Sequence, residues 1–140
     1  MEELDWKNLK IWVTPMTQEK LQYCIDSGIL PVFITRTLVN SPGFSGWNGT
    51  SVHLPRLAPS GILKKEWAYE GTLTQEEFEA KYILELNKVR FGEIFEKLEL
   101  MRYVSGASAI AFMGFPDDKT DILAGYINSL GILEQEITEL

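Results

Sequence analysis

His53 and Cys24 are the only histidine and the only cysteine in this chain of 140 residues. A metal site built from several histidines is therefore excluded, and a Ser-His-Asp arrangement could use only His53. No nucleophile-elbow motif accompanies His53, so a solvated loop histidine is favoured over a catalytic one, although its position in the basic segment keeps it among the candidate ligand-binding residues. Cys24 lies beside Ile25 on the apolar stripe of an expected helix, where an unpaired cysteine packs as a small hydrophobe. We expect no catalytic residue, no metal and no cofactor.

A basic segment in the middle of the chain contains the best candidates for anion binding. No Asp or Glu occurs between Ser27 and Lys65, although the chain has 20 acidic residues. Guanidinium and ammonium groups bind phosphates and carboxylates, and Arg does so with forked hydrogen bonds. The alternative is that these charges are scattered on the surface or pair with acids of the helices. The candidate ligand-binding residues are Arg36, His53, Arg56 and Lys64, together with Lys119, which is expected to face the same crevice.

Trp47 and Phe44 lie on a glycine-rich stretch and are candidates for contact with a ligand ring or a partner protein. The alternative is that they fill a small core of the loop itself. The glycines of this stretch do not form a phosphate-binding loop, because no Gly-Lys-Ser/Thr follows them. Asp117, Asp118 and Asp121 suggest a metal site, but their place at the start of an expected helix favours interaction with the helix dipole.

The overall charge and composition argue against several classes of protein. The net charge of −7 does not favour nonspecific nucleic-acid binding, which depends on Lys and Arg contacts to phosphates. One cysteine cannot form an internal disulfide, and the N-terminal residues lack the basic and apolar parts of a signal peptide. No apolar run approaches the roughly 20 residues of a membrane span. We therefore expect a single cytoplasmic domain over residues 1–140 that has no membrane partner.

Short apolar runs alternate with amphipathic segments in the first part of the chain. The run from Leu9 to Thr14 predicts a first strand, and Thr17 and Gly28 predict the two ends of the following helix. The run from Val32 to Thr35 lacks polar alternation, as expected of a strand covered on both faces, and it places Arg36 at its carboxyl end. Ligands of open parallel sheets bind at that edge.

Residues 37–60 show no period and predict a long irregular loop, which is followed by a short helix from Ile62 to Tyr69. Thr74 and Glu77 then form a capping box, and Leu73 and Phe78 form its hydrophobic staple, so a helix is expected to begin there. This amphipathic segment and the next one predict either two helices or one bent helix, with the junction near Gly92.

Further segments complete the expected architecture. Ala107 to Phe112 predicts a third strand, and the helix after it is expected to end at Gly131. Residues 132–140 predict a short strand, a helical turn or a frayed tail. Because strand, helix and strand within about 27 residues form the smallest parallel crossover unit, we predict a three-layer α/β fold. Its small, mostly parallel sheet would carry helices on both faces, in a Rossmann-like arrangement.

The most specific motif is Leu57-Ala58-Pro59-Ser60, followed by Gly-x-Leu-Thr-x-Glu-Glu-Phe at 71–78 and by Tyr82. With the strands ending at Thr14, Arg36 and Phe112, it resembles the domain-of-unknown-function family 488, a group of small Rossmann-like α/β proteins. The resemblance covers most of the chain, implies that fold, and adds Tyr82 to the expected ligand-binding residues. Many relatives carry a Cys-His-Arg cluster after the later strand. Residues 113–119 of this chain contain neither Cys nor His, so cysteine chemistry is not expected.

These observations lead to two hypotheses about function. The first is a noncatalytic or catalytically degenerate domain that binds a small anionic ligand, such as a nucleotide, at the carboxyl edge of its sheet. The second is a protein-interaction or inhibitor module, for example a phage or accessory protein, that uses its acidic surface and the Trp47 loop. A hydrolase or transferase ranks behind both, because the chain lacks a recognisable pair of nucleophile and base.

Overall fold

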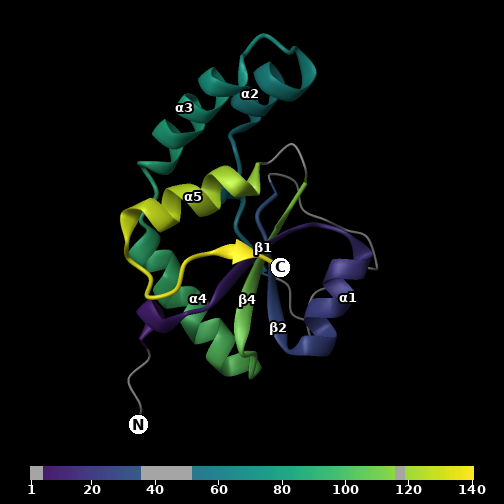
Figure 1. The fold of residues 1–140 in the computed structure, drawn as a ribbon, viewed down its shortest axis with the longest axis vertical. Coiled ribbons are helices and arrows are strands. Elements are labelled where there is room, and N and C mark those ends of the chain that lie inside the picture. The colour runs from purple at the N-terminus through teal and green to yellow at the C-terminus, as the bar shows by residue number, and fades with distance from the viewer. Residues whose placement is uncertain (1–4, 36–51, 116–118) are drawn as a thin grey trace.

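The computed structural model of the chain describes residues 5–35, 52–115 and 119–140. Within these residues, five strands form one parallel sheet in the order β3-β2-β4-β1-β5. β4 lies at the centre, with β1 on one side and β2 on the other (Figure 1). The strands are β1 (Ile11–Pro15), β2 (Ile29–Phe33), β3 (Val52–His53), β4 (Ala109–Gly114) and β5 (Thr138–Glu139).

The helices follow the amphipathic segments of the sequence. They are α1 (Gln18–Ser27), α2 (Gly61–Lys64), α3 (Gln75–Leu86), α4 (Phe91–Ser105) and α5 (Thr120–Leu130). α2 continues directly into the π-helical segment η4 (Lys65–Tyr69), and the 3-10 turns η1 (Trp6–Asn8) and η3 (Pro55–Leu57) precede β1 and α2. α3 and α4 are therefore two separate helices. No helix in the described part of the chain is long and apolar enough to cross a membrane.

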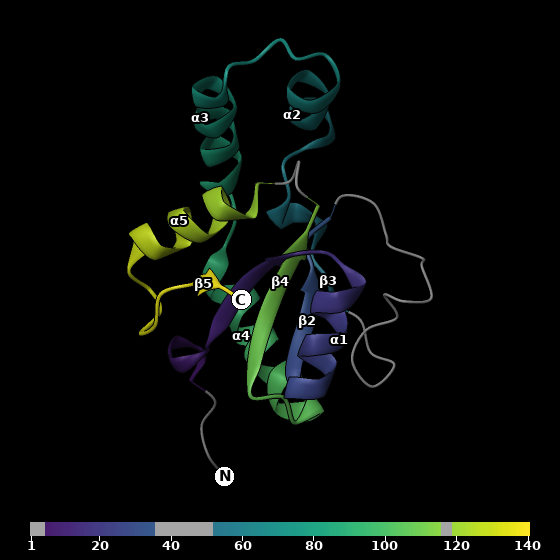
Figure 2. The ribbon, with the colours of Figure 1, turned by 45° about the vertical axis from the view of Figure 1, so that its right-hand side comes forward.

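The sheet separates two hydrophobic cores, as the side chains of β4 show. Ile110 and Phe112 belong to the core formed with α4 and α5, whereas Ala109, Ala111 and Met113 belong to the core shared with α1. Figures 1 and 2 show α1 on one side of the sheet and α4 on the other. The strand is buried on both faces, as the absence of polar alternation predicts. The predicted three-layer α/β fold, Rossmann-like with helices on both faces, is confirmed.

The α2–α3 pair extends beyond the carboxyl ends of the strands (Figure 2). Aromatic side chains hold the pair together: the ring of Trp67 stacks on Phe78 with 4.9 Å between centroids, and Phe78 contacts Tyr82 at 5.9 Å. Phe78 and Tyr82 are fully buried. Stacked and tilted ring pairs of this kind add to the free energy of apolar burial. The pair is thus a packed extension of the larger core.

The predicted helix ends are confirmed by their hydrogen bonds and backbone angles. Thr17 Oγ1 accepts from the Lys20 N–H at 3.1 Å, and Gly28 ends α1 with a left-handed φ of 70°. Thr74 Oγ1 accepts from the Glu77 N–H at 3.1 Å, while the Glu77 carboxylate accepts from the Thr74 N–H at 3.0 Å. The capping box therefore begins α3 as the sequence predicts.

Two predictions about strands need correction. β2 begins at Ile29, immediately after Gly28, and not at Val32. The segment predicted as an irregular loop contains β3 and η3 within its described part, residues 52–60. β3 pairs with only two residues of β2, so it is too short to show a period in the sequence. β1 and β2 do not pair with each other, because β4 lies between them.

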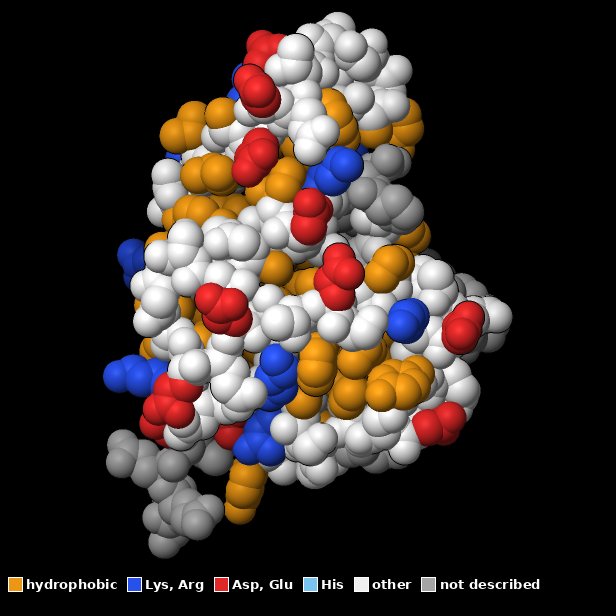
Figure 3. All heavy atoms as spheres, viewed as in Figure 1, with side chains coloured by type: hydrophobic (Ala, Val, Ile, Leu, Met, Phe, Trp, Pro, Cys, Tyr) orange, Lys and Arg blue, Asp and Glu red, His pale blue; other side chains and the backbone are white. Residues whose placement is uncertain are grey.

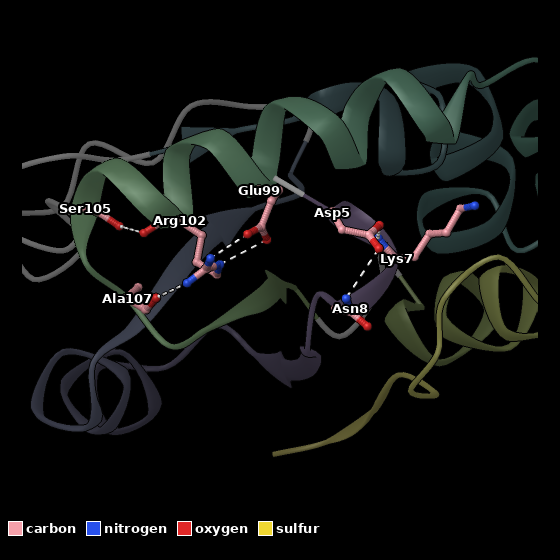
Figure 4. Close-up of polar contacts among 7 residues, drawn as sticks. All are labelled: Asp5, Lys7, Asn8, Glu99, Arg102, Ser105 and Ala107. Carbon is pink, nitrogen blue, oxygen red and sulfur yellow. Dashed lines mark hydrogen bonds and ion pairs between the residues drawn. The ribbon is translucent and has the colours of Figure 1, made fainter. Parts of the chain in front are cut away.

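A buried ion pair closes the end of α4 (Figure 4). The Arg102 guanidinium donates to both carboxylate oxygens of Glu99, at 3.0 and 2.5 Å, and its third nitrogen donates to the Ala107 carbonyl at 2.8 Å. Only 6% of the Glu99 surface is exposed. Hydrogen bonding to Glu99 raises the pKa of Arg102. The pair fixes the turn between α4 and β4.

Asp5, on the N-terminal segment in Figure 4, caps η1 by accepting from the Lys7 N–H.

Candidate functional site

The carboxyl ends of the strands lie at one edge of the sheet because the strands are parallel. His53 ends β3, and Met113, near the end of β4, pairs in register with the same β2 residue, Phe33. Neighbouring strands are about 4.8 Å apart, which places the Cα atoms of His53 and Met113 about 10 Å from each other. Side chains from β2, β3 and the β4–α5 connection can therefore reach one small ligand at this edge.

His53 is a half-buried strand residue, and this corrects the interpretation of it as a solvated loop residue. Its Nε2 lies 2.5 Å from the Thr35 carbonyl oxygen and 3.4 Å from the Thr35 hydroxyl. A contact of this length with a carbonyl oxygen requires a donor, so Nε2 carries a proton and donates to the Thr35 carbonyl. The ring thus ties the end of β3 to the chain that leaves β2.

Two lysines reach aromatic rings across the same edge. The Lys64 ammonium, from α2, lies 5.4 Å from the ring centroid of Phe115, the residue after β4. The Lys119 ammonium, from the start of α5, lies 5.6 Å from the ring centroid of Trp67 in η4. Lys64 of α2 therefore contacts the connection between β4 and α5, and Lys119 of that connection contacts η4, which continues α2. An ammonium above a ring is attracted by the ring electrons and still directs N–H groups away from the ring.

Lys119 has an unusual backbone conformation at the start of α5. Its φ of 49° makes it the one non-glycine residue with a positive φ in the described ranges. Its side chain carries only donors, so it cannot accept hydrogen bonds from the first turn of the helix. Asp121 lies in that first turn, as expected for an acid that interacts with the helix dipole. Strained backbone conformations of this kind often occur at functional sites.

Tyr82 lies inside the protein and not at a ligand surface. Its side chain is fully buried, and its hydroxyl donates to the Leu57 carbonyl of η3. The expectation that Tyr82 contacts a ligand does not fit this burial, because a ligand would first have to open the core. Tyr82 instead joins α3 to the Leu57-Ala58-Pro59-Ser60 segment. The two parts of the most specific sequence motif are therefore in direct structural contact.

Arg56 lines a cleft on the surface of the protein. It lines this cleft with Ser60 and with residues at the α3–α4 junction, while His53, Lys64 and Lys119 are not among its lining residues. Lys64, Lys119 and His53 belong to the strand-end region, whereas Arg56, in η3, lines this cleft beside the α3–α4 junction.

Other candidates have simpler outcomes. Cys24 is fully buried, and burial raises its pKa to about 11, so its prediction as a core residue is confirmed. Among the residues that the structure describes, no group of His, Cys, Asp and Glu could hold a metal ion. Arg36, Phe44, Trp47, Asp117 and Asp118 lie outside the described residues, so the predictions made for them stay predictions.

Sequence reasoning missed the aromatic partners of the lysines. Trp67 and Phe115 are far apart in the chain, and neither was itself a predicted site residue. Local spacing cannot show that a residue of η4 and the residue after β4 face the same region. The available signal was the position of Trp67, three residues after Lys64 on the expected helix from Ile62 to Tyr69.

No protein-family model, curated protein or solved structure matches this chain. The resemblance to family 488 therefore stays a prediction, and the case for a function depends on the geometry of the chain itself.

Proposed function

We propose that this protein binds a small anionic ligand, such as a nucleotide, at the carboxyl edge of its parallel sheet. The main support for this proposal is two cation–π contacts, in which Lys64 lies over Phe115 and Lys119 lies over Trp67. These contacts keep two cationic side chains, from α2 and α5, at the same strand ends. A phosphate group between them would receive charge-assisted hydrogen bonds, which are stronger than bonds between neutral groups.

Two further features favour an anion at this edge. α5 has 11 residues and begins beside Lys119, so its N-terminal dipole contributes positive potential there. Phe115, which is 36% exposed, offers apolar surface against which a nucleotide base could pack. The proposal includes Arg36, which follows Thr35 in the sequence and belongs to the acid-free segment. It requires no catalytic group, because binding alone accounts for the arrangement.

Calorimetric titration with AMP, ADP and pyrophosphate tests this proposal. We expect the wild type to bind at least one of them. Lys119→Gln should weaken that binding about tenfold, because it removes one charge-assisted contact of about 1.4 kcal/mol. Lys97→Gln is a matched control, since Lys97 is an exposed residue of α4. An equal affinity in the wild type and Lys119→Gln, or no binding of any of the three, would contradict the proposal.

A second variant separates loss of binding from loss of folding. Lys119→Gly removes the ammonium but suits the left-handed φ of this position. We expect this variant to remain as stable as the wild type and to bind the anion as weakly as Lys119→Gln. A variant that binds normally would show that the Lys119 charge has no role in recognition.

Exposed apolar residues on the α2–α3 pair favour a second candidate, a protein-interaction module. Ile62 is 75% exposed and Leu84 is 64% exposed, and both line a shallow groove between the two helices. Glu66, Lys81 and Glu85 line the same groove. Asp and Glu side chains are also distributed over the face shown in Figure 3, between hydrophobic ones. Large apolar side chains of this kind contribute binding energy when a partner covers them.

The two candidates predict different behaviour of an Ile62→Ser/Leu84→Ser double variant. If the groove binds a protein, a stoichiometric partner captured from a host lysate by the wild type should be lost with the double variant. Anion affinity should be unchanged. Capture of the same partner by both proteins would contradict a role for this groove.

A further inference from the structure

The cleft that contains Arg56 lies between the segment leading into α2 and the junction of α3 with α4. Its volume is about 490 Å³, and its lining residues are Arg56, Ser60, Glu85, Lys88, Val89, Arg90, Glu93 and Ile94. This volume falls within the range of about 300–1,000 Å³ that is typical of small-molecule sites. Two segments that are distant in the sequence, residues 56–60 and 85–94, therefore form one hollow.

The charges of this cleft differ from those of the protein as a whole. Arg56, Lys88 and Arg90 face two carboxylates, so the lining has a net charge of +1, whereas the chain has a net charge of −7. An anion bound in the cleft would balance this excess positive charge.

The two carboxylates of the cleft already have partners. Glu85 Oε1 accepts from the Ser60 N–H at 2.8 Å, and Glu93 Oε1 pairs with Arg90 at 3.4 Å. Among the described residues, no carboxylate forms an ion pair with Arg56 or Lys88. Arg56 and Lys88 therefore keep their donors for a ligand.

The remaining lining indicates what else the ligand carries. Val89 and Ile94 are partly buried apolar residues that pack against the main core and also line the cleft. An apolar part of a ligand gains free energy when it covers such a surface. Glu85 and Glu93 would repel a ligand with several negative charges. The lining therefore suits one anionic group attached to a small apolar body.

We propose that this cleft is a second ligand site, distinct from the carboxyl edge of the sheet, which binds a phosphate monoester or a carboxylate on an apolar group. Arg56 and Lys88 bind the anionic group, and Val89 and Ile94 contact the apolar part. The hydrogen bond from the Ser60 N–H to the Glu85 carboxylate holds the segment before α2 against α3. This site does not depend on Lys64, Lys119 or the proposed function.

Titration of the ¹⁵N-labelled protein with phenyl phosphate tests this inference, with inorganic phosphate and pyrophosphate as comparison probes. We expect saturable shifts of the Ser60, Lys88 and Val89 amides. Phenyl phosphate should bind at least about fivefold more tightly than inorganic phosphate, because its ring covers the apolar wall. Pyrophosphate should have no such advantage. Equal affinities for phenyl phosphate and inorganic phosphate would overturn the apolar contact.

Variants assign the site. Arg56→Gln/Lys88→Gln should weaken phenyl phosphate binding, measured at the Ser60, Lys88 and Val89 amides, by about tenfold or more, whereas Lys97→Gln and Lys119→Gln should leave the affinity measured at these amides unchanged. All four substituted residues are at least partly exposed, so the folds are expected to be intact, and the amide spectra verify this. Undiminished binding by the double variant would overturn the inference. An effect of Lys119→Gln on these same amides would place the probe at the carboxyl edge and would also overturn it.

Discussion

Glu99 and Arg102 show how a charged pair can be kept inside a small α/β protein. The guanidinium satisfies both oxygens of the carboxylate and also the Ala107 carbonyl, so each group that loses water gains a partner. Both residues lie near the amino edge of the sheet, since Ala107 precedes β4. The pair is therefore a structural feature, far from the strand ends at which we propose ligand binding.

We predict that Arg102→Met will lower the free energy of unfolding by about 2–3 kcal/mol, because it leaves a buried carboxylate without its partner. Arg90→Met is the matched control, since the Arg90–Glu93 pair is 82% and 72% exposed. Such exposed pairs contribute about 0.5 kcal/mol or less. Urea denaturation measures both variants. A loss for Arg102→Met no larger than that for Arg90→Met would contradict the account.

Cys24 is predicted to be unreactive in the native protein. Burial raises its pKa from the ordinary 9.0 to about 11, and the thiolate is the reactive form. A thiol-specific reagent at pH 8 should label the native protein far more slowly than the unfolded one. Since the raised pKa favours the protonated native state, this contribution to stability is complete below pH 9 and is lost as the pH rises toward 11. Rapid native labelling would contradict this burial.

At the scale of elements, α3 depends on its first turn. Hydrogen bonds with the backbone and side chain of Thr74 lower the pKa of Glu77, so the ionised carboxylate stabilises the folded state. This contribution is present above the ordinary pKa of 4.5 and is lost as the pH falls below it. The sequence pattern was sufficient to predict this helix start because all its hydrogen bonds are local.

Thr74→Ala should lower the free energy of unfolding by about 1 kcal/mol, because it removes the acceptor for the Glu77 N–H. Gln75→Ala, one residue later on the exposed surface, is the control and should change it by less than about 0.5 kcal/mol. Thermal or chemical denaturation of both variants makes the comparison. Equal effects of the two substitutions would show that the capping box does not stabilise α3.

Pro31 explains why the start of β2 was not predicted. Proline normally argues against a central strand, because it has no N–H for strand pairing. The Phe33 carbonyl of β2 accepts from the Leu54 N–H, which follows β3. Backbone groups two residues apart in a strand point to the same side, so the Pro31 nitrogen also points toward β3. Among the described residues, β3 pairs with β2 only at Val32 and Phe33. The missing N–H therefore interrupts none of the pairing within the described residues, a fact that depends on tertiary structure.

For the whole molecule, the alternation of strands and helices indicated the layers but not the order of the strands. β1 and β2 are joined by α1 and yet lie on opposite sides of β4, which comes much later in the chain. Because this order depends on contacts between distant residues, no local pattern reveals it. The same limit applies to the candidate site. Lys64 and Lys119 were selected by charge, whereas their aromatic partners and the cleft that Arg56 lines are visible only in the folded chain.

The central claim is that a small anion binds where the parallel strands end. Amide chemical-shift mapping with AMP on the ¹⁵N-labelled protein tests this most directly, because it reports the position of the ligand on the sheet. We predict saturable shifts at Thr35, His53, Phe115 and Lys119, with none at Gly28 or Ser108, which lie near the opposite edge. Shifts confined to that opposite edge, or no saturable shifts at all, would contradict the claim.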